Sequence, residues 1–65
     1  MLETMLSEVV KNFGLRMSKE ELVSKVELLI CKDYDVCVLN EKYLIVNGEK
    51  YQFIKTKNGW VAKQW

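Results

Sequence analysis

The segment from Lys42 to Trp65 reads KYLIVNGEKYQFIKTKNGWVAKQW and decides the fold of the chain. Apolar residues recur in it with a period close to two, the spacing of side chains on one face of a β-strand. Asn-Gly occurs twice, at 47–48 and 58–59, and it favours a two-residue hairpin turn because both residues tolerate positive φ. Together with a turn at Asn40-Glu41, these signals predict an antiparallel meander. The expected strands are residues 35–39, 42–47, 50–56 and 60–64.

Two helices are expected before this meander. Residues 2–13 carry apolar side chains at a helical period, and Gly14 follows where a left-handed residue would end the helix. Ser18 and Glu21 have the spacing of a capping box, which predicts a second helix over residues 19–32. The predicted fold class is therefore α+β, with two N-terminal helices packed on one face of a four-stranded antiparallel β-meander (ααββββ).

The length and composition of the chain limit what it can be. It has 65 residues, 49% of them hydrophobic, and a net charge of +1, so we expect a single small domain over residues 1–65. Glu3 stands where a secretory signal would be basic, and no apolar run approaches the roughly 20 residues of a membrane span. We therefore expect a cytoplasmic protein with no membrane association.

The predicted turns divide the sheet into two faces, because register fixes the direction of every side chain. If the turns contain two residues each, Leu44 lies opposite both Cys37 and Tyr51, and Lys55 lies opposite Ala62. The face expected to meet the helices comprises Cys37, Leu39, Leu44, Val46, Tyr51, Phe53, Trp60 and Ala62. The other face comprises Val36, Val38, Tyr43, Ile45, Ile54, Val61 and Trp65.

Both predicted faces are mainly apolar, whereas a sheet with one solvated face normally alternates apolar and polar residues. Two short helices can cover one side, so the second face is predicted to contact a partner, and a two-fold homodimer is the commonest arrangement. The alternative is a curled sheet in which the helices and Trp65 cover both sides.

Catalysis is not expected from this sequence. The chain has no histidine, which removes the usual general base and the usual metal ligand. Asp33 and Asp35 are expected to be solvated, and Cys31 and Cys37 to be buried free thiols, since two thiols cannot complete a zinc site. We predict no catalytic residue, metal, cofactor or small-molecule substrate.

Residues 50–65 contain four lysines and no acid, interleaved with aromatic residues. Proteins that bind single-stranded nucleic acid on a β-sheet combine basic and aromatic side chains in this way. The candidate contact residues are Lys50, Lys55, Lys57, Trp60 and Lys63. The predicted register places Lys55 and Lys57 on the helix side and Lys50 and Lys63 on the other, which counts against a single binding stripe.

The function that we favour from the sequence is a small non-enzymatic protein–protein interaction module, homodimeric through the second sheet face. Short chains without a recognisable motif are common among viral and mobile-element proteins that bind a host factor, and we favour that origin. The alternative is a small nucleic-acid-binding or regulatory domain that uses the basic and aromatic C-terminal hairpin.

Overall fold

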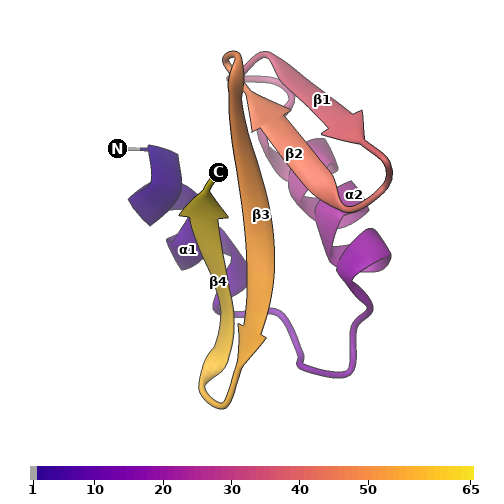
Figure 1. The fold of residues 1–65 in the computed structure, drawn as a ribbon, viewed down its shortest axis with the longest axis vertical. Helices are drawn as coiled ribbons and strands as arrows, with labels where there is room; N and C mark the ends of the chain where they lie inside the picture. Colours follow the sequence, from indigo (N-terminus) through magenta and orange to yellow (C-terminus); the bar gives the residue numbers. More distant parts are fainter. Residues whose placement is uncertain (1) are drawn as a thin grey trace.

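The protein, seen in a computed structural model that describes residues 2–65, has two helices followed by one four-stranded antiparallel sheet (Figure 1). The helices are α1 (Leu2–Val10) and α2 (Lys19–Ile30). The strands are β1 (Val36–Leu39), β2 (Tyr43–Val46), β3 (Glu49–Thr56) and β4 (Gly59–Gln64), and they lie side by side in that order. Both helices pack behind the sheet in the view of Figure 1, so the predicted α+β fold is confirmed.

The core lies between the sheet and the two helices. Helix α1 packs mainly against β4, while α2 packs against β1 and β2. The fully or almost fully buried residues are Leu6, Val10, Leu22, Val23, Val26, Ile30, Leu44, Val46, Tyr51, Phe53, Trp60 and Ala62. One layer of side chains therefore joins the helices to one side of the sheet, and no helix within residues 2–65 covers the other side.

The capping prediction is confirmed for α2 and wrong for α1. Ser18 accepts a hydrogen bond from the Glu21 amide at 3.2 Å, and α2 begins at Lys19 as predicted. Helix α1 ends at Val10 instead of Phe13, and Gly14 does not adopt positive φ. The chain turns early because the Phe13 amide donates to the Val10 carbonyl at 3.0 Å, which tightens the last turn.

The predicted register of the first hairpin is wrong by one residue. Asn40 and Glu41 have positive φ values of 54° and 62°, as a tight turn requires, but Lys42 adds a third residue before pairing resumes at Tyr43. Cys37 therefore lies opposite Ile45, and Val38 lies opposite Leu44. A shift of one residue exchanges the two faces of a strand.

This shift corrects the assignment of four residues in β1. Val36 and Val38, predicted for the second face, point toward the helices and pack against the core. Cys37 and Leu39, predicted for the helix side, lie on the other face. The observed register gives the core two β-branched valines and leaves the Cys37 side chain exposed.

The other two hairpins keep their predicted faces. Asn47 and Gly48 form the second turn, and Leu44 lies opposite Tyr51 as predicted. The third loop consists of residues 57–58 instead of 58–59, so Lys55 lies opposite Trp60. The pairing of β3 with β4 is therefore shifted by two positions. Because side chains alternate with a period of two, every side chain of β4 stays on its predicted side.

Candidate interaction face

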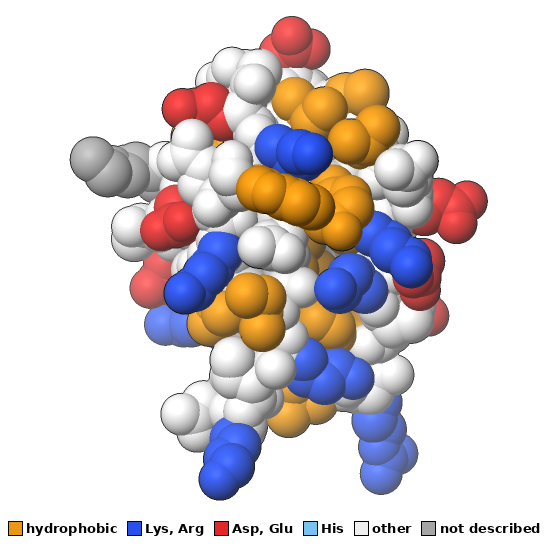
Figure 2. Space-filling model, viewed as in Figure 1, with side chains coloured by type: hydrophobic (Ala, Val, Ile, Leu, Met, Phe, Trp, Pro, Cys, Tyr) orange, Lys and Arg blue, Asp and Glu red, His pale blue; other side chains and the backbone are white. Residues whose placement is uncertain are grey.

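The side of the sheet that faces away from α1 and α2 is the candidate functional site, and we call it the outer face. Its side chains follow from the strand pairing and from the alternation of directions along each strand. They belong to Cys37, Leu39, Tyr43, Ile45, Lys50, Gln52, Ile54, Thr56, Val61, Lys63 and Trp65. Figure 2 views the molecule from this side and shows hydrophobic side chains with lysine and arginine side chains between them.

The outer face contains five of the seven residues predicted for partner contact. These five are Tyr43, Ile45, Ile54, Val61 and Trp65. Trp65 is 62% exposed and Ile54 is 37% exposed, while the other three are partly buried by their neighbours. Val36 and Val38 are absent from the face, and Cys37 and Leu39 take their places.

Three outer-face residues form a compact aromatic and cationic cluster at one end of the sheet. The rings of Tyr43 and Trp65 meet edge to face with centroids 4.7 Å apart. The ammonium group of Lys50 lies 4.2 Å from the Trp65 ring centroid and 5.6 Å from that of Tyr43. The Trp65 amide donates to the Lys50 carbonyl at 2.8 Å, which holds the C-terminal residue beside β3. The Lys50 ammonium therefore lies within cation–π distance of both rings.

The electrostatic character of the outer face is positive. Lys50 and Lys63 project from it, and none of its strand residues within 2–65 is acidic. Asp35, directly before β1, lies at its margin. Figure 2 shows the acidic side chains gathered toward the margin of the view. A face with apolar area and charge of one sign selects for partners of the opposite sign.

The five residues predicted to contact nucleic acid do not share one surface. Lys50 and Lys63 lie on the outer face, but Lys57 lies in the loop between β3 and β4. Lys55 lies on the helix side, with its ammonium 5.2 Å from the centroid of the Trp60 ring. Trp60 is only 3% exposed, so its ring is not free to stack on a base.

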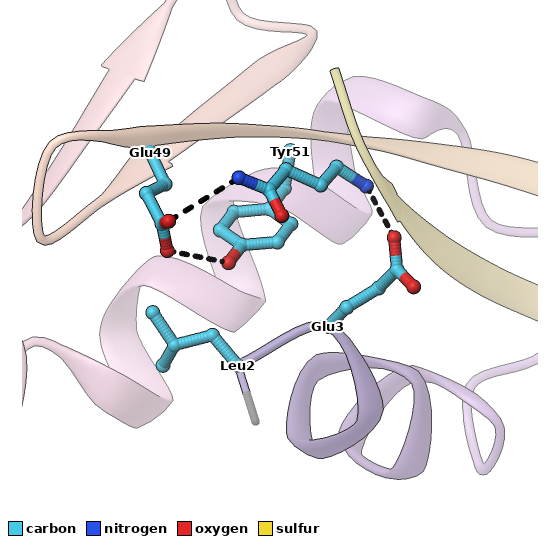
Figure 3. Close-up of a pocket in the computed structure, with 5 residues that line it drawn as sticks. Leu2, Glu3, Glu49 and Tyr51 are labelled. Atoms are coloured by element: carbon cyan, nitrogen blue, oxygen red, sulfur yellow. Dashed lines mark hydrogen bonds between the residues drawn. The ribbon is translucent and has the colours of Figure 1, made fainter.

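A hollow of about 340 Å³ lies where the start of α1 meets β3 and β4 (Figure 3). The Tyr51 hydroxyl donates to one Glu49 oxygen at 3.0 Å, and the Gln64 side-chain amide donates to the other at 3.3 Å. Burial, the hydrogen bond to Glu49 and the charges of Glu49 and Glu3 raise the pKa of Tyr51 to about 12. The polar groups satisfy one another, so this arrangement has the character of a structural network.

A second hollow, of about 330 Å³, lies beside α2 and is lined by Phe13, Lys25, Leu28 and Leu29. Leu28 is 72% exposed and Leu29 is 57% exposed, so the apolar surface of α2 extends beyond the part that meets the sheet. This hollow lies on a helix and not on the outer face of the sheet.

The two cysteines are free, as predicted, but both are exposed instead of buried. Cys31 caps the end of α2, and Cys37 lies on the outer side of β1 because of the register shift. Within residues 2–65, no group of three or more histidine, cysteine or acidic residues is placed to hold a metal ion. In the same range, no helix combines the length and apolar character that a membrane crossing requires.

Comparisons with protein-family models, with curated proteins and with solved structures give no match for this chain. The geometry of the outer face is therefore what indicates a function.

Proposed function

We propose that the protein is a non-enzymatic binding module that docks through its outer face onto an acidic and partly apolar surface of another protein. The observation that carries this proposal is the uncovered side of the sheet. Ile54 and Trp65 are exposed there, Leu39, Tyr43, Ile45 and Val61 are partly exposed, and Lys50 and Lys63 are the charged strand residues of the face within 2–65.

A protein partner fits this face better than a nucleic acid does. Single-stranded nucleic acid binders offer free aromatic rings on which bases stack. Here the Lys50 ammonium lies over the Trp65 ring, and Trp60 is buried. The Tyr43 ring packs edge to face against Trp65. The other large apolar residues of the face are aliphatic, and the interior of a protein–protein interface accommodates such side chains.

Face-to-face dimerisation fits the charges less well than an acidic partner does. If two outer faces met around a two-fold axis, Lys50 and Lys63 of one copy would enter the same interface as those of the other. Within residues 2–65, Asp35 beside β1 is the acid that alternation places on this side, and the strand order separates it from Lys50 on β3 and Lys63 on β4. Like charges in a desolvated interface oppose binding.

A peptide titration tests the proposal. The probe is a synthetic peptide of alternating glutamate and leucine, and a single-stranded oligonucleotide is titrated in parallel. We expect the peptide to shift the NMR signals of Tyr43, Ile45, Lys50 and Trp65. Lys50→Glu combined with Lys63→Glu should abolish these shifts, whereas Lys25→Glu, a charge reversal on α2, should leave them unchanged.

Three other results of this experiment would contradict the proposal, and each would favour a different binding mode. Binding of the oligonucleotide alone, weakened by salt and by the double substitution, would favour the nucleic-acid alternative. A dimer in solution that Ile45→Lys dissociates would favour the face-to-face homodimer. Peptide shifts confined to the Phe13–Leu28–Leu29 hollow would move the binding site to α2.

A further inference from the structure

The two edge strands of the sheet, β4 and β1, differ in whether their outward backbone groups have hydrogen-bond partners. The Ala62 amide donates to the Ser7 hydroxyl at 3.0 Å, and that hydroxyl donates to the Ala62 carbonyl at 3.2 Å. The Gln64 amide donates to the Glu3 carboxylate at 2.6 Å. Side chains of α1 thus occupy backbone groups of β4 that would otherwise point away from the sheet, and this edge is closed to a further strand.

The edge formed by β1 is open. The Asp35 amide donates to the Asn47 side-chain oxygen at 3.0 Å, and the Asp35 carbonyl accepts from the Asn47 amide at 2.7 Å. The backbone groups of Asp35 therefore point toward the residue that follows β2. Because backbone directions alternate along an antiparallel strand, the amides and carbonyls of Val36 and Val38 point outward. Within residues 2–65, the side-chain contact made to these outward groups is a long one, from the Cys37 thiol to the Val38 carbonyl at 3.9 Å.

The sequence of β1 does not protect this edge. The strand reads VCVL, without a lysine, a proline or any charge. Natural sheets usually protect a free edge with such residues or with a bulge, because unpaired backbone groups recruit other strands. An unprotected edge of this kind is a template on which another strand can pair.

We propose that a second copy of the chain adds its own β1 to this edge, antiparallel and around a two-fold axis. In the register that uses all outward groups, Val36 of each copy lies opposite Val38 of the other, and the two residues exchange both backbone hydrogen bonds. Cys37 then lies on the axis and faces Cys37 of the second copy. The two sheets join into one.

The second copy is the occupant because the strand is complementary to itself in this register. Asp35 of one copy lies opposite Leu39 of the other, so no two like charges lie directly opposite each other along β1. The outer face, by contrast, would bring the lysines of two copies into one interface. Joining two sheets at β1 also makes their outer faces continuous. Pairing at the edge uses the backbone of β1 and does not depend on the function proposed for the outer face.

The expected association is weak. Only two outward residues in each strand contribute backbone hydrogen bonds, so we expect a dissociation constant of the order of 0.1–1 mM. Sedimentation equilibrium over a concentration series that reaches roughly 1 mM measures it. Cys37→Lys places two positive charges opposite each other at the axis and should weaken association about tenfold. Cys31→Lys is the matched control, because Cys31 is also exposed and lies outside β1.

Oxidative cross-linking by diamide tests the register. In a pair without mutual hydrogen bonds, facing Cα atoms lie about 4.5 Å apart, a separation that a disulfide accommodates. Two Cys37 thiols would lose two protons and two electrons to diamide and form one S–S bond. The wild type and Cys31→Ser should yield a covalent dimer, and Cys37→Ser should not.

The proposal is overturned if the protein stays monomeric in the concentration series, if Cys37→Lys and Cys31→Lys associate equally, or if cross-linking proceeds through Cys31. Lys50→Glu with Lys63→Glu separates this inference from the proposed function. That variant should lose peptide binding and keep self-association, so failure of either proposal is seen without the other.

Discussion

The hydroxyl of Ser7 both accepts from the amide of Ala62 and donates to its carbonyl, across 55 residues of sequence. One small side chain on α1 thus replaces the strand that would otherwise pair with β4. Because the contact is partly buried, water compensates incompletely when it is lost.

We expect Ser7→Ala to lower the free energy of unfolding by about 1–2 kcal/mol, because it leaves the amide and the carbonyl of Ala62 without partners. Urea unfolding followed by circular dichroism measures the change. Thr4→Ala is the control, since Thr4 is exposed on the same helix and alanine there gains a few tenths of a kcal/mol in helix propensity, roughly. Equal stability of the two variants would show that the Ser7 contact is not stabilising.

The local signals in the sequence predict the fold well where one short segment determines the geometry. Ser18 caps α2 at the predicted position, and Asn47-Gly48 forms the predicted turn. Each depends on hydrogen bonds or φ values of adjacent residues. The ααββββ order follows from such signals alone.

The features that sequence reasoning missed depend on distant contacts. Lys42 adds one residue to the first turn, and the observed register packs Val36 and Val38 against the helices and pairs Asp35 with Asn47. Gly14 does not end α1 as a left-handed residue. Its carbonyl instead accepts hydrogen bonds from the Met17 amide and from the Trp60 indole, at 3.2 Å each, and the second donor is far away in sequence.

The candidate site was predictable in part for the same reason. The outer-face assignment was correct for five residues because the observed second and third turns keep the predicted alternation of side chains. These residues are Tyr43, Ile45, Ile54, Val61 and Trp65. The contact of Lys50 with the rings of Tyr43 and Trp65 was not predicted, although the pairing of Ile45 with Lys50 follows from the predicted Asn47-Gly48 turn. The closure of β4 by Ser7 and Glu3 required knowledge of where α1 lies.

Glu41 occupies a left-handed conformation, with φ of 62°, that is unfavourable for a residue with a side chain. Glu41→Gly should therefore raise the free energy of unfolding by about 0.5–1 kcal/mol, after the added flexibility of the unfolded chain is counted. Lys42→Gly, in the same loop but without positive φ, should lower it. Glu41→Gln removes the charge alone and should leave stability unchanged; a gain there would assign the effect to charge instead of φ.

Trp60 connects the sheet to the segment after α1, because its indole nitrogen donates to the Gly14 carbonyl and its ring is almost fully buried. Trp60→Phe removes both the donor and part of the buried volume, and we expect a loss of about 1–3 kcal/mol. Trp65→Phe changes the same residue type at an exposed position and should alter stability by less than about 0.5 kcal/mol. Chemical unfolding of both variants compares them, and similar losses would contradict the structural role of Trp60.

Tyr51 should make the protein sensitive to alkaline pH. Its pKa in the folded protein is about 12, against an ordinary value of 10.0, because burial and Glu49 disfavour the charged phenolate. Below pH 10.0 the hydroxyl is protonated in both states, and its stabilising contribution is complete. As pH rises from 10.0 to about 12, the unfolded chain releases this proton while the folded chain retains it, so the free energy of unfolding falls.

Tyr51→Phe removes this titration, so the stability advantage of the wild type over the variant should shrink steadily across that window. Urea unfolding of both proteins at a series of pH values measures it, and the difference between them isolates the contribution of this one hydroxyl. Parallel stability profiles would show that Tyr51 ionises at its ordinary pH in the folded protein. They would also remove Glu49 as the group that keeps the hydroxyl protonated.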